Sequence, residues 1–407
     1  MALNLLEHVA FAYQPIWGRT RQLIGVRLRV RVVNPESVSA AQLLHLLSEE
    51  LSADSPFVLV SFAEAGFLRE ALSVNPHEHI WLELPDFGDD VPPGLLETVA
   101  YAHRMGHRLV QDAPLARAKP LPSIGQGVHR YLLHLWPEQA SQALHAARHM
   151  REGAAAHSPV LAEQLYRGIG QRELAMHCLD DCGAWGLCGW PVDDVLIPYQ
   201  RYGVPVDKLT LVRVQQALMR QSSMEVVEDL IHQDAVLTFR TLRLVNSPVF
   251  GTSREVTTVR QALMLLGQRR LRDWLLELMP GASGDRELLP VRLGLVLRAR
   301  LMEHLMEAGL QRDLRTEIYV TGLFSMLGQL MNEPLSSALR RIPVSEAMGD
   351  ALLREAGPYH TYLDIARRME RFDELQHLPG LCDAAAFPID HVNRSLIRTI
   401  AGWRNTL

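Results

Sequence analysis

The sequence predicts a two-domain protein, a (β/α)8 barrel followed by an all-α bundle. The chain has 407 residues, more than one ordinary domain holds. Short apolar runs alternate with helical patterns over the first 200 residues, which is typical of a mainly parallel sheet. Beyond about residue 205 the strand-like runs cease. We therefore expect domains at 1–195 and 196–407, joined near 191–208, where Pro and Gly interrupt the periodicity.

The expected barrel elements follow the chain in order. Strand candidates are the apolar runs at 26–33, 57–62, 79–84, 108–110, 131–135, 174–177 and 186–189. Helical patterns lie between several of them, at 40–51, 94–105 and 137–151. Seven or eight such units in about 200 residues fit a compact (β/α)8 barrel.

The segment 229–267 predicts three helices of the second domain. Asp234 is a good N-cap, and Asn246-Ser247 before Pro248 ends the helix that follows it. Gly267 stands where a C-cap glycine belongs. Capping-box patterns begin at Ser222 and Thr258. Further helices are expected at 209–220, 271–279, 291–308, 317–331, 344–356, 359–372 and 392–403.

The composition describes a globular protein without a strong charge bias. The chain has 41 basic and 46 acidic residues and a pI of about 6.4, which disfavours nucleic acid as a partner. There is no run of 18 apolar residues and no basic signal region, so we expect no membrane segment and a cytoplasmic location. Lys119 and Lys208 are the only lysines available to any lysine-dependent mechanism.

The cysteines and histidines do not form a recognisable metal motif. Cys178, Cys182 and Cys188 lie near His177 but lack the Cys-x2-Cys spacing of a zinc knuckle. Histidine pairs at 103/107 and 145/149 share helical faces without an acidic third ligand. We therefore expect no metal and no cofactor.

Residues 11–195 resemble the EAL-type cyclic-di-GMP phosphodiesterases. The resemblance begins with FAYQPI at 11–16 and GVRLRVR at 25–31 and continues in order along the domain. It implies a (β/α)8 barrel with its active site at the C-terminal ends of the strands. Such an enzyme holds two divalent cations, Mg²⁺ or Mn²⁺, with several carboxylates and an Asn. A lysine adds positive charge near the reacting phosphate.

Most of these groups are missing at the matching positions. Arg27 stands where the family has its name-giving Glu, and a guanidinium would repel a metal cation. The Asn-bearing strand matches Val60-Ser61, which offers no strong ligand, and the lysine strand near 131–135 has no lysine. Lys119 precedes that strand in a Pro-rich loop. Cys188 replaces a Gln.

Some polar positions of the family pattern are retained. They are Gln14, Glu83, Asp112 and, in an Ala-Glu motif, Glu163. In the family, Asp112 would be the first of two adjacent aspartates, but the second position is Ala113 here. The second acid of the Ala-Glu motif is replaced by Tyr166. The resemblance therefore implies a degenerate EAL domain without phosphodiesterase activity. Weak cyclic-di-GMP binding is the alternative that stays open, because Gln14 is retained.

Residues 205–400 resemble the HDOD domains, most strongly at 229–267. The residues that carry the resemblance are Asp234, Asn246, Ser247 and Gly267. HDOD domains are similar in fold to HD-type phosphohydrolases but lack their metal-binding His-Asp pair. Ser325 and Met326 stand at that pair, and both are poor ligands for Mg²⁺ or Mn²⁺, so we expect a packed helix there. Asn246 and Ser247 are expected to be structural, with a partner contact as the alternative.

Together these patterns predict a non-catalytic signal-transduction protein that acts by protein–protein interaction. A degenerate EAL domain followed by an HDOD domain is a known pair, and EAL-type barrels often dimerise, so a homodimer is expected. The alternative is a cyclic-di-GMP receptor or a residual cyclic-di-GMP phosphodiesterase.

Overall fold

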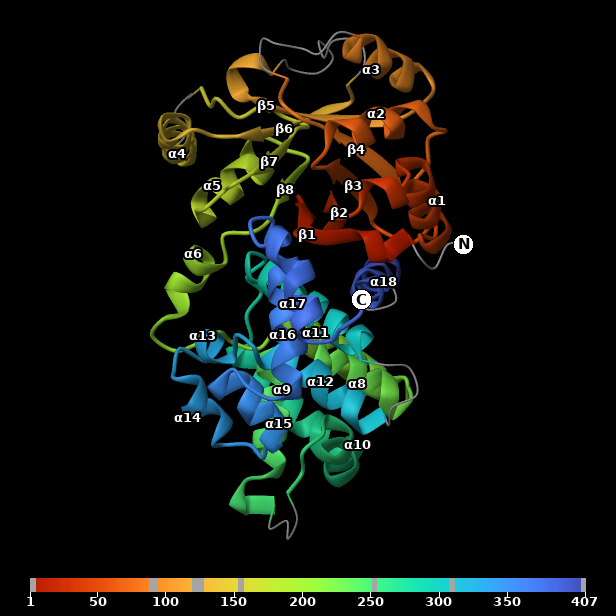
Figure 1. The fold of residues 1–407 in the computed structure, drawn as a ribbon. Coiled ribbons are helices and arrows are strands. Elements are labelled where there is room, and N and C mark those ends of the chain that lie inside the picture. The colour runs from red at the N-terminus through yellow and green to blue at the C-terminus, as the bar shows by residue number, and fades with distance from the viewer. Residues whose placement is uncertain are drawn as a thin grey trace. The chain divides into compact units, whose positions relative to one another are not determined.

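The computed structural model describes residues 5–87, 94–118, 128–152, 157–250, 255–306 and 312–403, which form two compact units (Figure 1). The first unit comprises the chain up to Val195 together with the segment from Arg368 onward. The second unit comprises Leu196–Arg367. The expected helical domain at 196–407 therefore differs from the structure at its end, because the C-terminal segment groups with the barrel.

The first unit is built on a closed barrel of eight strands in sequence order. β1 is antiparallel to its neighbours β2 and β8, and the other neighbouring strands are parallel. The strands are β1 Val9–Gly18, β2 Leu23–Val32, β3 Phe57–Phe62, β4 Ile80–Leu84, β5 Arg108–Pro114, β6 Arg130–His134, β7 Leu165–Arg167 and β8 Gly186–Cys188.

Several helices of this unit lie around the outside of the strands (Figure 1). The α-helices of the unit are α1 Ala40–Glu50, α2 Ala65–Ser73, α3 Leu95–Arg104, α4 Pro137–Arg151, α5 Arg172–Met176, α6 Val192–Leu196, α17 Leu378–Ala384 and α18 Ile389–Ala401. In α1, Ser39 caps the N-terminus by accepting from the Gln42 amide, and Leu43, Leu44 and Leu47 form the buried face.

One expected strand is wrong, and β1 and β7 were not among the expected strands. Residues 174–177 belong to α5 and to the π-helical turn that follows it, His177–Asp181. The seventh strand lies earlier, at Leu165–Arg167, and is only three residues long. A short apolar run cannot by itself distinguish a buried helix from a strand, and Leu174 and Ala175 are buried on a helix face.

The barrel interior is filled by one apolar layer. It consists of Ile16, Leu59, Trp81, Val110, Leu132, Leu165 and Cys188, with Ile24, Phe57 and Trp185 packed against it. Because side chains alternate along a strand, residues two positions further along point to the same side. The parallel strands thereby carry Ser61, Glu83, Asp112, His134 and Arg167 to the C-terminal mouth of the barrel.

The second unit is helical. Beyond residue 205 the described ranges contain no strand, only a single bridge between Asp207 and Ser283. The helices are α7 Lys208–Met219, α8 Met224–His232, α9 Ala235–Val245, α10 Val259–Leu278, α11 Leu288–Leu305, α12 Arg312–Phe324, α13 Leu327–Met331, α14 Leu335–Leu339, α15 Glu346–Gly349, a π-helical turn Asp350–Arg354 and α16 Pro358–Met369. α8 is capped by Ser223, one residue later than the expected Ser222. Thr258 caps α10 as expected.

Candidate functional site

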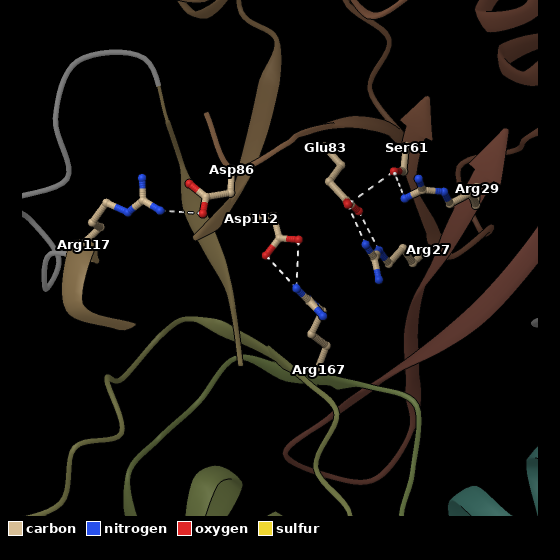
Figure 2. A network of polar contacts seen from close by, with 8 residues as sticks. All are labelled: Arg27, Arg29, Ser61, Glu83, Asp86, Asp112, Arg117 and Arg167. Atoms are coloured by element: carbon tan, nitrogen blue, oxygen red, sulfur yellow. Dashed lines mark hydrogen bonds and ion pairs between the residues drawn. The ribbon is translucent and has the colours of Figure 1, made fainter. Parts of the chain in front are cut away.

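The mouth of the barrel holds a network of acidic and basic side chains (Figure 2). Arg27 and Arg29 come from β2, Ser61 from β3 and Glu83 from β4. Asp112 comes from β5 and Arg167 from β7, and the network also includes the pair Asp86 and Arg117.

Arg27 and Glu83 form a buried bidentate ion pair. Arg27 Nε donates to Glu83 Oε2 and Arg27 Nη2 to Oε1, each at 2.6 Å. The side chains are 8% and 4% exposed. Burial opposes the charge of Arg27, but the neighbouring carboxylate outweighs it and raises the pKa of Arg27. Ser61 Oγ donates to Glu83 Oε1 at 3.3 Å, so both carboxylate oxygens are occupied.

The other acids at the mouth are also paired with arginines. Arg167 Nη2 lies 3.2 and 3.1 Å from the two carboxylate oxygens of Asp112. Arg117 Nη2 donates to Asp86 at 2.6 Å. Figure 2 shows Arg27 pointing at Glu83 and Arg167 pointing at Asp112. The guanidinium groups therefore neutralise these two carboxylates.

An aromatic side chain of the C-terminal segment covers Arg27. The ring centroid of Phe372 lies 4.9 Å from Arg27 Cζ, a cation–π contact. Two residues earlier, Glu370 accepts a hydrogen bond from Tyr13 Oη at 3.4 Å. The segment that follows α16 therefore lies over this side of the mouth.

Five of the predicted EAL positions meet at this end of the barrel. Gln14 is the register partner of Arg27. A Cβ on Gly189, whose φ is +78°, would lie 2.7 Å from Gln14 Nε2, so the turn after β8 packs directly on this amide. Cys188 is buried close to both ion pairs, and burial raises the pKa of its thiol to about 12. It is therefore a neutral packing residue.

Glu163 does not join them. It precedes β7, has a φ of +60°, and its carbonyl and carboxylate accept hydrogen bonds from Arg130 at 2.5 and 3.3 Å. Arg130 begins β6 and stacks on Trp185, so Glu163 lies at the N-terminal rim of the barrel. The mouth position of β7 belongs to Arg167, the last residue of the strand. The expected alignment of the Ala-Glu motif with the mouth is wrong.

Sequence reasoning missed Arg167, and the signal that could have found it is weak. Gly168, with a φ of +71°, ends the strand directly after it.

Lys119, the one lysine expected near the barrel, lies outside the described residues. The C-terminal residue of the matching strand β6 is His134.

The mouth does not fit the two divalent cations that the resemblance implies. The carboxylates of Glu83 and Asp112 face guanidinium groups, which would repel a metal ion. Across the described part of the chain, no group of three or more His, Cys, Asp or Glu side chains is arranged to hold a metal.

In the helical unit, Asp234 connects three helices. It caps α9 by accepting from the amides of Val236 and Leu237 at 2.8 and 3.1 Å, as predicted. It also accepts from the amide of Asp207, the N-cap of α7, at 2.7 Å. Arg292 of α11 forms an ion pair with it, and both side chains are buried. Sequence reasoning found the cap but not this ion pair.

Asn246 closes the loop between α9 and α10. Its Nδ2 donates to the carbonyls of Leu242 and Val256 at 2.7 and 2.8 Å. Its Oδ1 accepts from the Val256 amide at 2.9 Å. Ser247 Oγ donates to the Leu244 carbonyl at 2.7 Å. Both side chains therefore do structural work at the end of α9.

Gly267 interrupts α10 instead of ending it. Its φ of 67° and ψ of 165° break the helix, and a second helical stretch continues to Leu278. A residue with a Cβ is strained at this backbone conformation, which explains the glycine.

Comparison with protein families assigns most of this unit: the HDOD domain family matches residues 204–340. Residues 204–340 form an HDOD domain. A closed eight-stranded barrel precedes it in sequence, so the predicted order of an EAL-like (β/α)8 barrel fold followed by an HDOD domain is confirmed.

Curated relatives and solved structures are more distant. YuxH of Bacillus subtilis, an uncharacterized protein, is 25% identical over 156 residues, which cover 37% of each chain. The cyclic di-GMP phosphodiesterase CdgJ of Vibrio cholerae is 24% identical over 198 residues, 49% of this chain and 46% of CdgJ. The matches thus span less than half the length of these relatives. The PaMucR phosphodiesterase in its c-di-GMP complex matches 47% of this chain and 96% of its own at 15% identity and a TM-score of 0.27. The barrel assignment rests on strand topology instead.

The HDOD domain has a turn at the position of the HD pair. α12 ends at Phe324 and α13 begins at Leu327, so the expected continuous helix over 317–331 is wrong at Ser325 and Met326. Ser325 Oγ accepts a hydrogen bond from Arg298 at 2.7 Å, and Met326 is the N-cap of α13. Neither side chain supplies a good ligand for Mg²⁺ or Mn²⁺.

A polar cavity of about 370 Å³ lies between α8, α11 and α12 of the HDOD domain. It is lined by Glu228, Asp229, His232, Arg300, Glu303, Arg315, Thr316 and Tyr319. Burial and the charge of Arg300 lower the pKa of His232 to about 3, so its ring is neutral. Several acids and bases of the lining pair with one another or with neighbours, including Arg300 with Glu303 and Glu228 with Arg260.

Within the described ranges, no helix is both long enough and apolar enough to cross a membrane.

Proposed function

We propose that this chain is a non-catalytic regulatory protein of cyclic-di-GMP signalling, and that its HDOD domain acts by binding a protein partner. The observation that carries the proposal is the pairing of Glu83 and Asp112 with Arg27 and Arg167 at the barrel mouth. A phosphodiesterase of this type needs those acids to hold cations that activate water. Here the guanidinium groups of Arg27 and Arg167 stand where the metal cations would bind.

The cover over Arg27 supports the same conclusion. A dinucleotide at the mouth would have to displace Phe372 from the Arg27 guanidinium. It would also have to separate a buried ion pair, which leaves an uncompensated charge and costs about 3–5 kcal/mol. We therefore propose that neither hydrolysis nor tight binding of cyclic-di-GMP occurs. The phosphodiesterase activity in the name of CdgJ belongs to that relative.

The test is hydrolysis and binding of cyclic-di-GMP by the whole chain. We expect no linear product with Mg²⁺ or Mn²⁺, measured by chromatography, and no heat of binding at micromolar concentration in calorimetry. Hydrolysis that disappears in Glu83→Gln would overturn the proposal and place activity at the mouth. Micromolar binding that disappears in Gln14→Ala would favour a receptor instead.

Partner binding is supported by large apolar side chains that the HDOD domain leaves exposed. Met219 on α7, Val226 on α8 and Met264 on α10 are 67%, 45% and 72% exposed, and these three helices pack on one another. Contiguous exposed apolar patches mark interaction sites, and we propose that these three side chains contribute to one. The homodimer and the cytoplasmic location expected from the sequence stay predictions.

Affinity capture from the native cell tests this surface. We expect Met264→Glu to abolish capture of the partner. The matched control is Leu353→Glu, which places the same charge at a 45% exposed leucine elsewhere in the helical unit. If both variants capture the partner as well as the unaltered chain does, the surface around Met264 is not the docking site.

A further inference from the structure

A Cys–His–Asp arrangement lies on the outer side of the barrel, apart from the mouth. It is formed by the π-helical turn His177–Asp181 and by Cys182, which ends that turn. The Cys182 amide donates to the His177 carbonyl at 2.9 Å, the wide spacing of a π-helix. Single π-helical turns inside helices occur frequently at functional sites.

His177 connects the thiol to the carboxylate. Its Nδ1 lies 2.8 Å from Asp181 Oδ2, and its Nε2 lies 3.3 Å from Cys182 Sγ. Ser158 Oγ also lies 2.9 Å from Nε2. The imidazole is fully buried, whereas Asp181 is 35% exposed. A carboxylate on Nδ1 fixes the ring so that Nε2 faces the thiol, which is the geometry that activates a cysteine nucleophile.

The surroundings of His177 favour its protonated form. Burial alone would lower the pKa of His177, but the hydrogen bonds and negative charges of Cys182 and Asp181 outweigh it and raise that pKa. When His177 is protonated, its charge stabilises a thiolate next to it.

Cys182 differs in its exposure from the other three cysteines. It is partly exposed, whereas Cys178, Cys188 and Cys382 are buried. Burial raises the pKa of all three of these thiols, to about 12 for Cys188 and about 11 for Cys382. They are neutral and inert, and they serve as controls within the same chain.

We propose that Cys182 is a reactive thiolate activated by His177, and that a hydroperoxide oxidises it to a sulfenic acid. The sulfur attacks one oxygen of hydrogen peroxide, an S–O bond forms and the O–O bond breaks. Sulfur loses two electrons and the peroxide gains them. The departing hydroxide takes the Nε2 proton of His177 and leaves as water. This proposal is independent of the function proposed for the mouth and the HDOD domain.

The test begins with alkylation of the folded, full-length chain by iodoacetamide at neutral pH, followed by mass spectrometry of each cysteine. About 3% of an ordinary cysteine is thiolate at pH 7, so a stabilised thiolate should react on the order of tenfold faster than free cysteine. We expect this rate at Cys182 and no reaction at the three buried cysteines. A rate at Cys182 no higher than that of free cysteine would overturn the proposal.

Variants separate activation from simple exposure. His177→Gln should reduce the Cys182 rate to the ordinary value. Because His177 is buried and this variant could unfold, Asp181→Asn provides a second test at a partly exposed position. It should slow the reaction several-fold, and Asp181→Glu should restore part of the rate, since Asp181 is a positioning residue. Unchanged rates in folded Asp181→Asn and His177→Gln would contradict activation by the histidine.

The oxidation step has its own measurement. Hydrogen peroxide in the presence of dimedone should add one dimedone to Cys182 and none to Cys178, Cys188 or Cys382. Cys182→Ser should remove the adduct. Absence of the Cys182 adduct, or labelling spread equally over the cysteines, would overturn the proposed sulfenic acid.

Discussion

At the residue scale, the Arg27–Glu83 pair defines the barrel mouth. Both hydrogen bonds are 2.6 Å long and both side chains are buried, so removing one partner strands a buried charge. We expect Arg27→Met to lower the free energy of unfolding of the barrel by about 3–5 kcal/mol. Arg27→Met combined with Glu83→Gln should recover much of that loss, because no charge is then left unpaired. Denaturant unfolding of the four members of this cycle measures the coupling, and additive losses would contradict it.

His232 makes a second residue-scale prediction, on pH. Its pKa is about 3 when folded and about 6.5 when unfolded, so between these values only the unfolded chain binds the proton. The free energy of unfolding is therefore highest above pH 6.5, where His232 is neutral in both states. It decreases as the pH falls below 6.5, because the unfolded chain then gains a proton that the folded chain does not bind. Between pH 7 and pH 5 this loss is about 2 kcal/mol. We expect His232→Phe to flatten the pH dependence of denaturant unfolding of the helical unit by this amount. If the free energy of unfolding changes equally with pH in both proteins, His232 is not the cause of the pH dependence.

At the element scale, the loop between α9 and α10 is secured by one amide. Asn246→Ala leaves the Val256 amide and carbonyl without their side-chain partner. We expect a loss of about 2–3 kcal/mol in the unfolding of the helical unit, since each unsatisfied buried group costs about 1–3 kcal/mol. Ser247→Ala, the neighbouring control, removes one bond to Leu244 and should cost less than about 1 kcal/mol. Denaturant unfolding measures both losses. Equal losses in the two variants would contradict a special role of the Asn246 hydrogen bonds to Val256.

The same scale shows what the sequence could predict. Helices with a good cap and an apolar face, such as α9 behind Asp234, were predictable because both signals are local. β7 was not, because three residues carry too little periodicity. The family resemblance assigned Glu163 to the active site, whereas the structure has Arg167 at the mouth position of β7. Arg27 was identified as a lost ligand, but its partner Glu83 lies 56 residues away, and only the closed barrel brings them together.

At the scale of the whole molecule, the HDOD domain is inserted in sequence between the barrel and the barrel's own C-terminal segment. α18 packs against β1 and α1. Asn393 of α18 is fully buried and donates from Nδ2 to the carbonyls of Leu6 and Val9, each at 2.8 Å. The last helix of the chain therefore holds the start of the first strand.

This arrangement predicts that damage to α18 destabilises the first unit selectively. Asn393→Ala leaves two buried carbonyls without this donor, which should cost about 2–4 kcal/mol. In hydrogen exchange measured by mass spectrometry, we expect faster exchange in β1, β2 and α18 and unchanged exchange in α9 and α11. The matched control is Ser395→Ala, which removes a buried hydroxyl from the same helix and should have a smaller effect. Equal acceleration in α9 and α11 would mean that the two units unfold as one, and that the C-terminal helix does not belong to the barrel alone.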